Sequence, residues 1–83
     1  MPTVARIDGI RVDFYYDEHP PPHFHAIFGE FRAAIAISGD EILKGFIPPA
    51  KFAMIRKWKN ARKAALEQAF DDCANHIDPG VVE

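Results

Sequence analysis

The chain has 83 residues and a mass of 9.4 kDa, which suffices for one hydrophobic core and excludes an enzyme of several domains. Hydrophobic residues make up 48% of the sequence and charged residues 27%, a balance typical of a chain that folds. The formal net charge of −2 disfavours a surface that coats nucleic acid over its whole length. Because a domain of this size buries only about 60% of the surface of its unfolded chain, we expect a partner, a metal or self-association to stabilise it further.

The sequence carries no pattern of a targeting or membrane segment. Residues 1–6 lack the apolar core of a signal peptide, and no apolar run approaches the roughly 18 residues that cross a bilayer. Cys73 is the single cysteine, so it cannot form an internal disulfide. We therefore expect a cytoplasmic protein with no membrane partner, in which Cys73 packs as a small hydrophobic residue.

Five short β-prone runs precede the helical part of the sequence. The first two, residues 3–7 and 10–16, flank Asp8-Gly9, a dipeptide that suits the positive φ angles of a type I′ turn, and they predict an antiparallel hairpin. Alternation along the second run is typical of a sheet with one wet face. It places Val12, Phe14 and Tyr16 on one face and Arg11, Asp13 and Tyr15 on the other. The remaining runs are residues 23–28, 31–37 and 41–47.

One long helix is expected after the strands. Pro48-Pro49 predicts its start, because proline suits the first turn, where its missing N–H would be unpaired anyway. Residues 50–74 contain no glycine or proline, and at about 100° per residue their apolar side chains form one stripe that would pack on the sheet. That stripe consists of Phe52, Ile55, Trp58, Ala65, Leu66, Ala69, Phe70 and Cys73. The tail after it contains Asp78-Pro79-Gly80, which predicts a helix stop and a frayed end.

These elements predict one α+β domain over residues 1–83. An antiparallel sheet of four or five strands, within residues 3–47, packs against a single C-terminal helix at residues 49–74, and a frayed tail occupies residues 75–83. Phe52 and Trp58 are expected in the core, since a small domain needs its largest side chains inside.

The string His19-Pro20-Pro21-Pro22-His23-Phe24-His25 is the strongest candidate for chemistry. On an extended strand, His23 and His25 project from the same face about 6–7 Å apart. That spacing permits joint ligation of Zn²⁺, with a third ligand from elsewhere and an open position for water. His19 is the expected third ligand, held near the pair by a stiff, extended proline segment.

A His-x-His pair alone is a weak metal signal, so two other interpretations stay open. The string can form a rigid loop in which the imidazoles bond to carboxylates such as Asp17 and Glu18. It can also form a protein-recognition surface. The aromatic residues assigned to this loop are Tyr15, Tyr16 and Phe24.

A basic stretch precedes an acidic one in the predicted helix. Residues 51–63 carry lysines and arginines without an acid, and residues 67–83 carry acids without a base. This order opposes the helix dipole. The cations can lie solvated over the core, face an acidic protein surface, or contact a nucleic-acid backbone as a secondary interpretation. The residues proposed for such contacts, here named the basic helix segment, are Lys57, Lys59, Arg62 and Lys63.

The histidine string, together with Arg6-Ile7-Asp8-Gly9-Ile10, resembles the small bacterial family catalogued as domain of unknown function 4160. The resemblance covers nearly the whole chain. The family has no assigned activity, so no catalytic residue is transferred from it. Its members are often encoded beside another small family, domain of unknown function 2442, so the resemblance implies a two-gene arrangement similar to a toxin–antitoxin pair.

The leading prediction is therefore a non-enzymatic protein-interaction module without a cofactor. Its contact surfaces would be the histidine loop and the basic helix segment, and its partner a small protein encoded nearby or a second copy of itself. The first alternative is a metal-dependent hydrolase or nuclease that binds Zn²⁺ or Ni²⁺ through His19, His23 and His25. The second is a regulator that binds DNA through the basic helix segment.

Overall fold

The fold is that of a computed structural model, which describes residues 2–16, 18–39 and 41–82. Met1, Asp17, Asp40 and Glu83 lie outside the described residues, and with them the expected contact between Asp17 and a histidine. In chain order the elements are β1 (Thr3–Ile7), β2 (Ile10–Asp13), β3 (His23–Phe28), β4 (Phe31–Ala36), β5 (Ile42–Phe46), α1 (Pro49–Asn60) and α2 (Lys63–Ala74).

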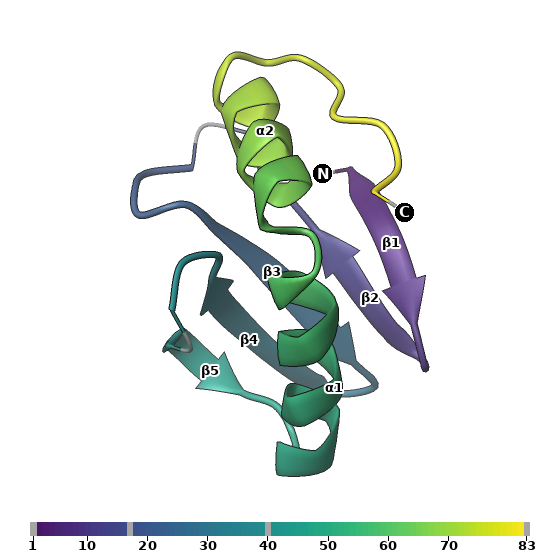
Figure 1. The fold of residues 1–83 in the computed structure, drawn as a ribbon. Helices are drawn as coiled ribbons and strands as arrows, with labels where there is room; N and C mark the ends of the chain where they lie inside the picture. The colour runs from purple at the N-terminus through teal and green to yellow at the C-terminus, as the bar shows by residue number, and fades with distance from the viewer. Residues whose placement is uncertain (1, 17, 40, 83) are drawn as a thin grey trace.

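The strands form one antiparallel sheet of 5 strands in the order β1-β2-β3-β4-β5 (Figure 1). Each strand pairs with its neighbour in the sequence, which confirms the predicted α+β class. In the first turn, Asp8 has a φ of 49° and Gly9 a φ of 80°, as the type I′ prediction requires. β2 ends at Asp13 rather than at residue 16, because the chain leaves the sheet there and enters the loop that carries the histidine string.

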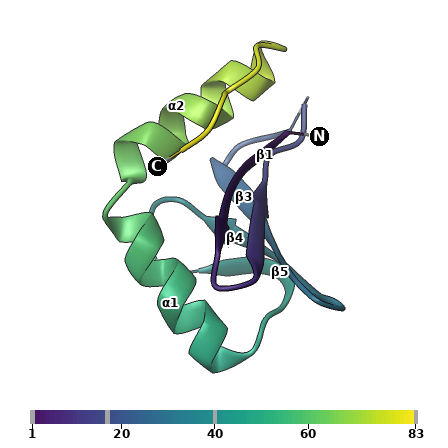
Figure 2. The ribbon, with the colours of Figure 1, turned by 90° about the vertical axis from the view of Figure 1, so that its right-hand side faces the viewer.

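Both helices lie on one side of the sheet, and the opposite face is left uncovered (Figure 2). Val12 and Phe14 face the helices and are buried, as predicted, whereas Tyr16 lies beyond the end of β2 and is 39% exposed. Asp13 was expected on the wet face but is buried, because Thr3 and Arg11 donate hydrogen bonds to its carboxylate. The core side chains on the strands or directly after them include Val4, Ile10, Val12, Phe14, Phe24, Ala26, Ala33, Ile35 and Ile37.

The single helix predicted for residues 49–74 is divided in two. It begins at Pro49, as predicted, but α1 ends at Asn60 and α2 begins at Lys63, with Arg62 at φ −134° and ψ 25° between them. A continuous helix would place the Arg62 guanidinium inside the apolar stripe, where an unpaired charge is costly. The break instead lets this group lie over the Trp58 ring and donate a hydrogen bond to the Trp58 carbonyl oxygen at 3.2 Å.

The break also changes which helical side chains reach the core. Phe52 and Trp58 are half-buried against the core, and Ala65, which a continuous stripe would have included, is exposed. The helical residues that are fully part of the core are Ile55, Leu66, Ala69, Phe70 and Cys73. In the described part of the chain, no helix combines the length and the hydropathy that crossing a bilayer would require.

The two ends of the chain lie side by side at β1 (Figure 1). The backbone N–H of Val82 donates to the Val4 carbonyl oxygen at 2.8 Å, and the Val82 side chain is 8% exposed. Residues 75–82 form neither helix nor strand after the turn that ends α2. The tail that we expected to be frayed therefore packs its last described residue against the sheet.

Candidate metal centre

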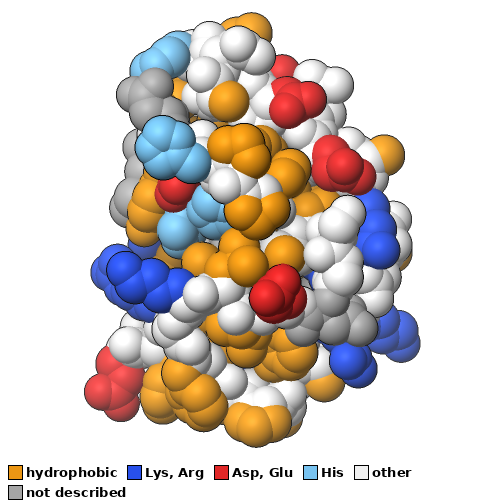
Figure 3. All heavy atoms as spheres, turned by 90° about the vertical axis from the view of Figure 1, so that its left-hand side faces the viewer, with side chains coloured by type: hydrophobic (Ala, Val, Ile, Leu, Met, Phe, Trp, Pro, Cys, Tyr) orange, Lys and Arg blue, Asp and Glu red, His pale blue; other side chains and the backbone are white. Residues whose placement is uncertain are grey.

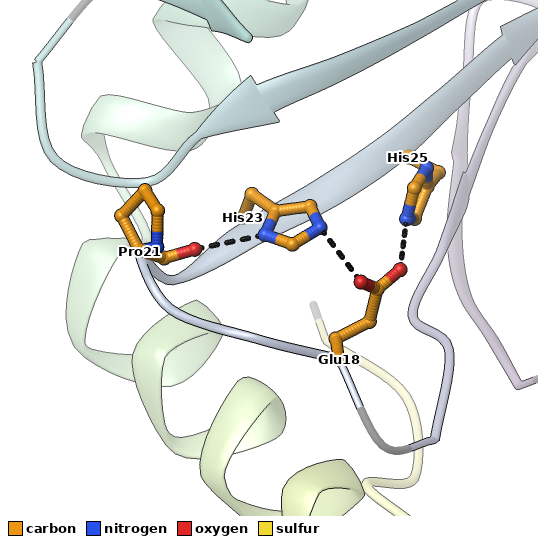
Figure 4. A network of polar contacts seen from close by, with 4 residues as sticks. All are labelled: Glu18, Pro21, His23 and His25. Carbon is orange, nitrogen blue, oxygen red and sulfur yellow. Dashed lines mark hydrogen bonds and ion pairs between the residues drawn. The ribbon is translucent and has the colours of Figure 1, made fainter. Parts of the chain in front are cut away.

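Three side chains that commonly ligate metals converge beside the start of β3 (Figure 4). His23 and His25 come from β3, where alternate residues share one face, and Glu18 comes from the loop after β2. One ligand atom of each residue lies within 4.8 Å of the other two. Oε1 of Glu18 is 2.7 Å from His25 Nε2, and Oε2 is 3.3 Å from His23 Nε2.

A backbone contact orients the His23 ring. Its Nδ1 lies 2.8 Å from the Pro21 carbonyl oxygen, and because a carbonyl can only accept, Nδ1 carries a proton. In the neutral ring, Nε2 is then the atom with a lone pair, and it faces Glu18. The ring is buried, with its centroid 5.7 Å from the ring of Phe70 in α2. Histidine ligands in metal sites are typically oriented in this way, with the second ring nitrogen donating to a carbonyl.

Stacking holds the His25 ring. The centroids of Tyr15 and His25 are 3.9 Å apart and their planes differ by 15°, so the tyrosine covers one side of the imidazole. The rings of His23 and His25 meet nearly edge to face, at 75° and 5.2 Å. The two imidazoles therefore do not stack on each other, and each directs Nε2 toward the carboxylate of Glu18.

This donor set fits a transition-metal ion of the Zn²⁺ class. Two imidazole nitrogens and one carboxylate are the protein ligands of several catalytic zinc sites, which keep a fourth position for water. With metal–ligand bonds of 2.0–2.1 Å, tetrahedral geometry separates the ligand atoms by about 3.3 Å. The contacts of 2.7 and 3.3 Å involve the two different oxygens of Glu18, and one donor atom of each residue lies within 4.8 Å of the other two, so the side chains shift slightly to reach that separation. Small movements of Glu18, whose side chain is 23% exposed, would open room for an ion.

The cluster lies within a segment that matches a known family. A family model described as Domain of unknown function (DUF4160) matches residues 9–71. The chain belongs to the DUF4160 family. This result confirms the resemblance carried by the histidine string. The curated proteins and the solved structures contain no significant match to the chain.

In this DUF4160 domain, His19 is not one of the converging ligands. Its side chain is exposed, and the group found among the described residues joins Glu18 to His23 and His25 instead. The predicted straight proline segment bends at Pro20 and Pro21, so it does not hold His19 beside the pair. Glu18 was not singled out as a ligand, because a contact between residues 7 positions apart depends on the path of the loop.

The three predicted loop aromatics have different positions in the domain. Tyr15 belongs to the candidate centre through its stack on His25. Tyr16 is exposed and stacks instead on His76, with centroids 5.7 Å apart. Phe24 is fully buried in the core, because it alternates with His23 and His25 and therefore faces the helices.

The basic helix segment does not form one surface. Lys57 and Lys63 are exposed, and Arg62 is half-buried beside Trp58. Lys59 is fully buried, and its ammonium donates hydrogen bonds to the carbonyl oxygens of Ala36 and Gly39. It therefore cannot contact DNA or a protein partner in this fold.

Proposed function

We propose that this DUF4160 domain is a metal-dependent hydrolase whose ion is held by Glu18, His23 and His25. The observation that supports the proposal is the convergence of these three side chains, with both rings oriented by neighbouring groups. When bound, such an ion lowers the pKa of a coordinated water and so supplies a nucleophile at neutral pH. Zn²⁺ suits the donor set best, and Ni²⁺ and Co²⁺ also bind imidazole.

The protein's own groups do the positioning at this site. The Pro21 carbonyl oxygen keeps the proton of His23 on Nδ1, and Tyr15 fixes the plane of the His25 ring. The neutral His25 ring donates its Nε2–H to the Glu18 carboxylate, because a carboxylate can only accept. Metal binding requires the His25 proton to move from Nε2 to Nδ1. Because ligand histidines must be neutral and a ligand carboxylate ionised, binding at this site weakens as the pH falls.

Cobalt titration tests the proposal. Protein stripped with EDTA and dialysed is titrated with Co²⁺, and binding is followed by visible absorption and by the melting temperature. We expect one ion per chain. At an ion concentration of one hundred times Kd, binding adds about 2.7 kcal/mol to the free energy of unfolding. The loaded protein is then assayed for hydrolysis of activated carboxylic and phosphoric esters.

The variants Glu18→Gln and His25→Gln should lose the cobalt spectrum and the rise in melting temperature. The matched control is His19→Gln, which changes an exposed histidine of the same loop outside the cluster. It should bind like the wild type. Absence of stoichiometric binding by the wild type, or equal loss in His19→Gln, would overturn the assignment of the ligands.

A second candidate function, contact with a small protein partner, is supported by a shallow hollow on α1. It has a volume of about 440 Å³ and combines apolar side chains, among them the 38% exposed Met54, with cations at its border. Its lining is Ile7, Met54, Lys57, Trp58, Ala61 and Arg62. By charge complementarity, the occupant would be an acidic, partly apolar segment of a partner of the domain of unknown function 2442 type.

Co-expression with the product of the adjacent gene tests this second candidate. A complex should survive Lys63→Glu, which lies outside the hollow, and should be lost in Lys57→Glu. If the wild-type proteins do not co-purify, or if both variants behave alike, the hollow is not the contact surface.

A further inference from the structure

The uncovered face of the sheet carries a hollow next to the candidate metal centre. The strand register aligns Asp13 with His25, His25 with Ala34, and Ala34 with Lys44, so these four side chains form one row across β2 to β5. The small side chain of Ala34 leaves space between the larger side chains on either side. The result is a hollow of about 260 Å³ whose lining includes Tyr15, His25, Ile27, Arg32, Ala34 and Lys44.

The charge around this hollow is positive. Arg32 and Lys44 are both exposed, and no carboxylate among the described residues forms an ion pair with either. Asp13 adds little negative charge, since it is buried and Arg11 lies 3.0 Å from its Oδ2. The Glu18 carboxylate lies against His23 and His25 and is not among the side chains that line the hollow. On the side of the molecule in Figure 3, basic side chains lie directly below the histidines.

Size and donor geometry restrict the ligand. At about 260 Å³, the hollow is smaller than the roughly 300–1,000 Å³ of sites that enclose drug-sized molecules. It can hold one anionic group while the rest of the ligand extends into solvent. Arginine presents a planar fork of N–H donors that matches phosphate oxygens, and lysine adds a compact positive charge.

We propose that the hollow binds the phosphate group of a phosphate ester. His25 belongs to both the hollow and the metal cluster, so a phosphate held there would share a side chain with the residues that would hold the ion. The proposal deepens the proposed function, on which its catalytic part rests: water adds its oxygen to phosphorus, the ester P–O bond breaks, and the leaving oxygen takes a proton from the water. The products are a phosphate and an alcohol.

Binding is tested without metal, so that it can be separated from the proposed function. EDTA-stripped protein is titrated with inorganic phosphate, a nucleoside monophosphate and a short single-stranded oligonucleotide, while backbone amide signals are followed by NMR. Signals of Ala34, Lys44 and Gly45 should shift. Tighter binding of either ester than of inorganic phosphate supports an ester ligand. Tighter binding of the nucleoside monophosphate indicates a monoester, and tighter binding of the oligonucleotide indicates a diester. Equal binding of all three overturns the ester assignment.

The double variant Arg32→Gln, Lys44→Gln should bind at least about tenfold more weakly, since each charged contact contributes more than a neutral one. Lys63→Gln is the control, because it removes an exposed cation from α2. Both variants must keep the wild-type pattern of amide signals elsewhere. The phosphate site is overturned if the wild type binds no phosphate, or if Lys63→Gln weakens phosphate binding as much as the double variant does. Either result counts even if cobalt binds. Phosphate binding without cobalt binding overturns the proposed function alone.

Discussion

Lys59 places an ammonium group inside the domain, between α1 and the end of β4. Its side chain is 0% exposed, and the Nζ atom donates hydrogen bonds to Ala36 and Gly39. A buried cation is tolerated only where such acceptors replace water. Lys59 therefore connects α1 to the β4–β5 turn, and its aliphatic stem fills core volume at the same time.

Lys59→Met tests this connection, because methionine keeps the volume of the stem and removes the donor. We expect the free energy of unfolding to fall by about 1–3 kcal/mol, the usual cost of leaving buried acceptors unpaired. Urea denaturation measures the change. Lys63→Met, an exposed lysine of α2, should stay within about 0.5 kcal/mol of the wild type. Equal stability of the two variants would show that the ammonium contacts contribute nothing.

Cys73 combines burial with neighbouring carboxylates. Desolvation, together with the charges of Asp72 and Asp78, raises the pKa of its thiol above the ordinary value of 9.0. In the unfolded chain the thiol ionises at its ordinary pKa, and in the folded chain it ionises only at higher pH. Its contribution to stability is therefore fully present below pH 9 and is lost as the pH rises through the folded-state pKa.

Comparison with Cys73→Ala isolates this contribution. We expect the stability advantage of the wild type over Cys73→Ala to be constant between pH 7 and 8 and to shrink above pH 9. Urea denaturation of both proteins across this pH range measures the difference in their free energies of unfolding. The lysines and tyrosines titrate in both proteins, so their effects cancel in this difference. An advantage that grows with pH would contradict the raised pKa.

Among the elements, β5 depends on one glycine. Gly45 has a φ of +84°, and a Cβ atom there would overlap the Arg32 carbonyl oxygen of β4. The pairing of β4 with β5 is also irregular between Ala34 and Ile35, which indicates a bulge. Glycine is needed at this position because the two backbones approach closely in a conformation that other residues rarely adopt.

Gly45→Ala should therefore lower the free energy of unfolding by clearly more than about 1–2 kcal/mol, which is the cost of placing an alanine in the left-handed conformation. Gly29→Ala is the matched control, because Gly29 has a φ of +58° but no atom within 4 Å of its would-be Cβ. Thermal and urea denaturation of the two variants measure the difference. Similar losses would mean that the backbone of β5 shifts freely away from β4.

The elements differ in how far local sequence signals could predict them. Some signals involve only a few neighbouring residues. These are the Asp8-Gly9 turn, the alternation along β2, and Pro49 at the start of α1. The strands and the start of the helix were therefore predictable. The break at Arg62 was not, because no glycine or proline marks it. It depends on where the guanidinium finds partners in the folded domain.

The candidate centre was predictable only in part, for the same physical reason. His23 and His25 share a face through strand alternation, which a sequence pattern reveals. Glu18 and Tyr15 reach those rings through a loop, whereas His19 in the same loop is exposed and lies outside the cluster. Such contacts depend on the loop conformation, so the sequence alone favoured His19.

For the molecule as a whole, the C-terminal tail packs along β1, where Val82 bonds to Val4. Val82 is 8% exposed, whereas its neighbour Val81 is 73% exposed. Val82→Asp should lower the free energy of unfolding by about 1–3 kcal/mol, because it puts a carboxylate into an apolar contact. Val81→Asp should change it by less than about 0.5 kcal/mol. Urea denaturation distinguishes them, and equal effects would show that the tail does not stabilise the sheet.

The opposite edge of the sheet is protected differently. Among the described strands β5 pairs with β4 alone. Leu43 is 37% and Phe46 56% exposed, so the backbone groups on the outer side of β5 could pair with a strand from another molecule. A charged side chain and a bulge on an edge strand oppose such aggregation, and β5 has both, in Lys44 and at Leu43, where the register steps from Lys44 to Ile42. Protection of this edge and the proposed binding of phosphate thus depend on the same lysine. Neutralising Lys44 is therefore expected to increase self-association as well as to weaken phosphate binding.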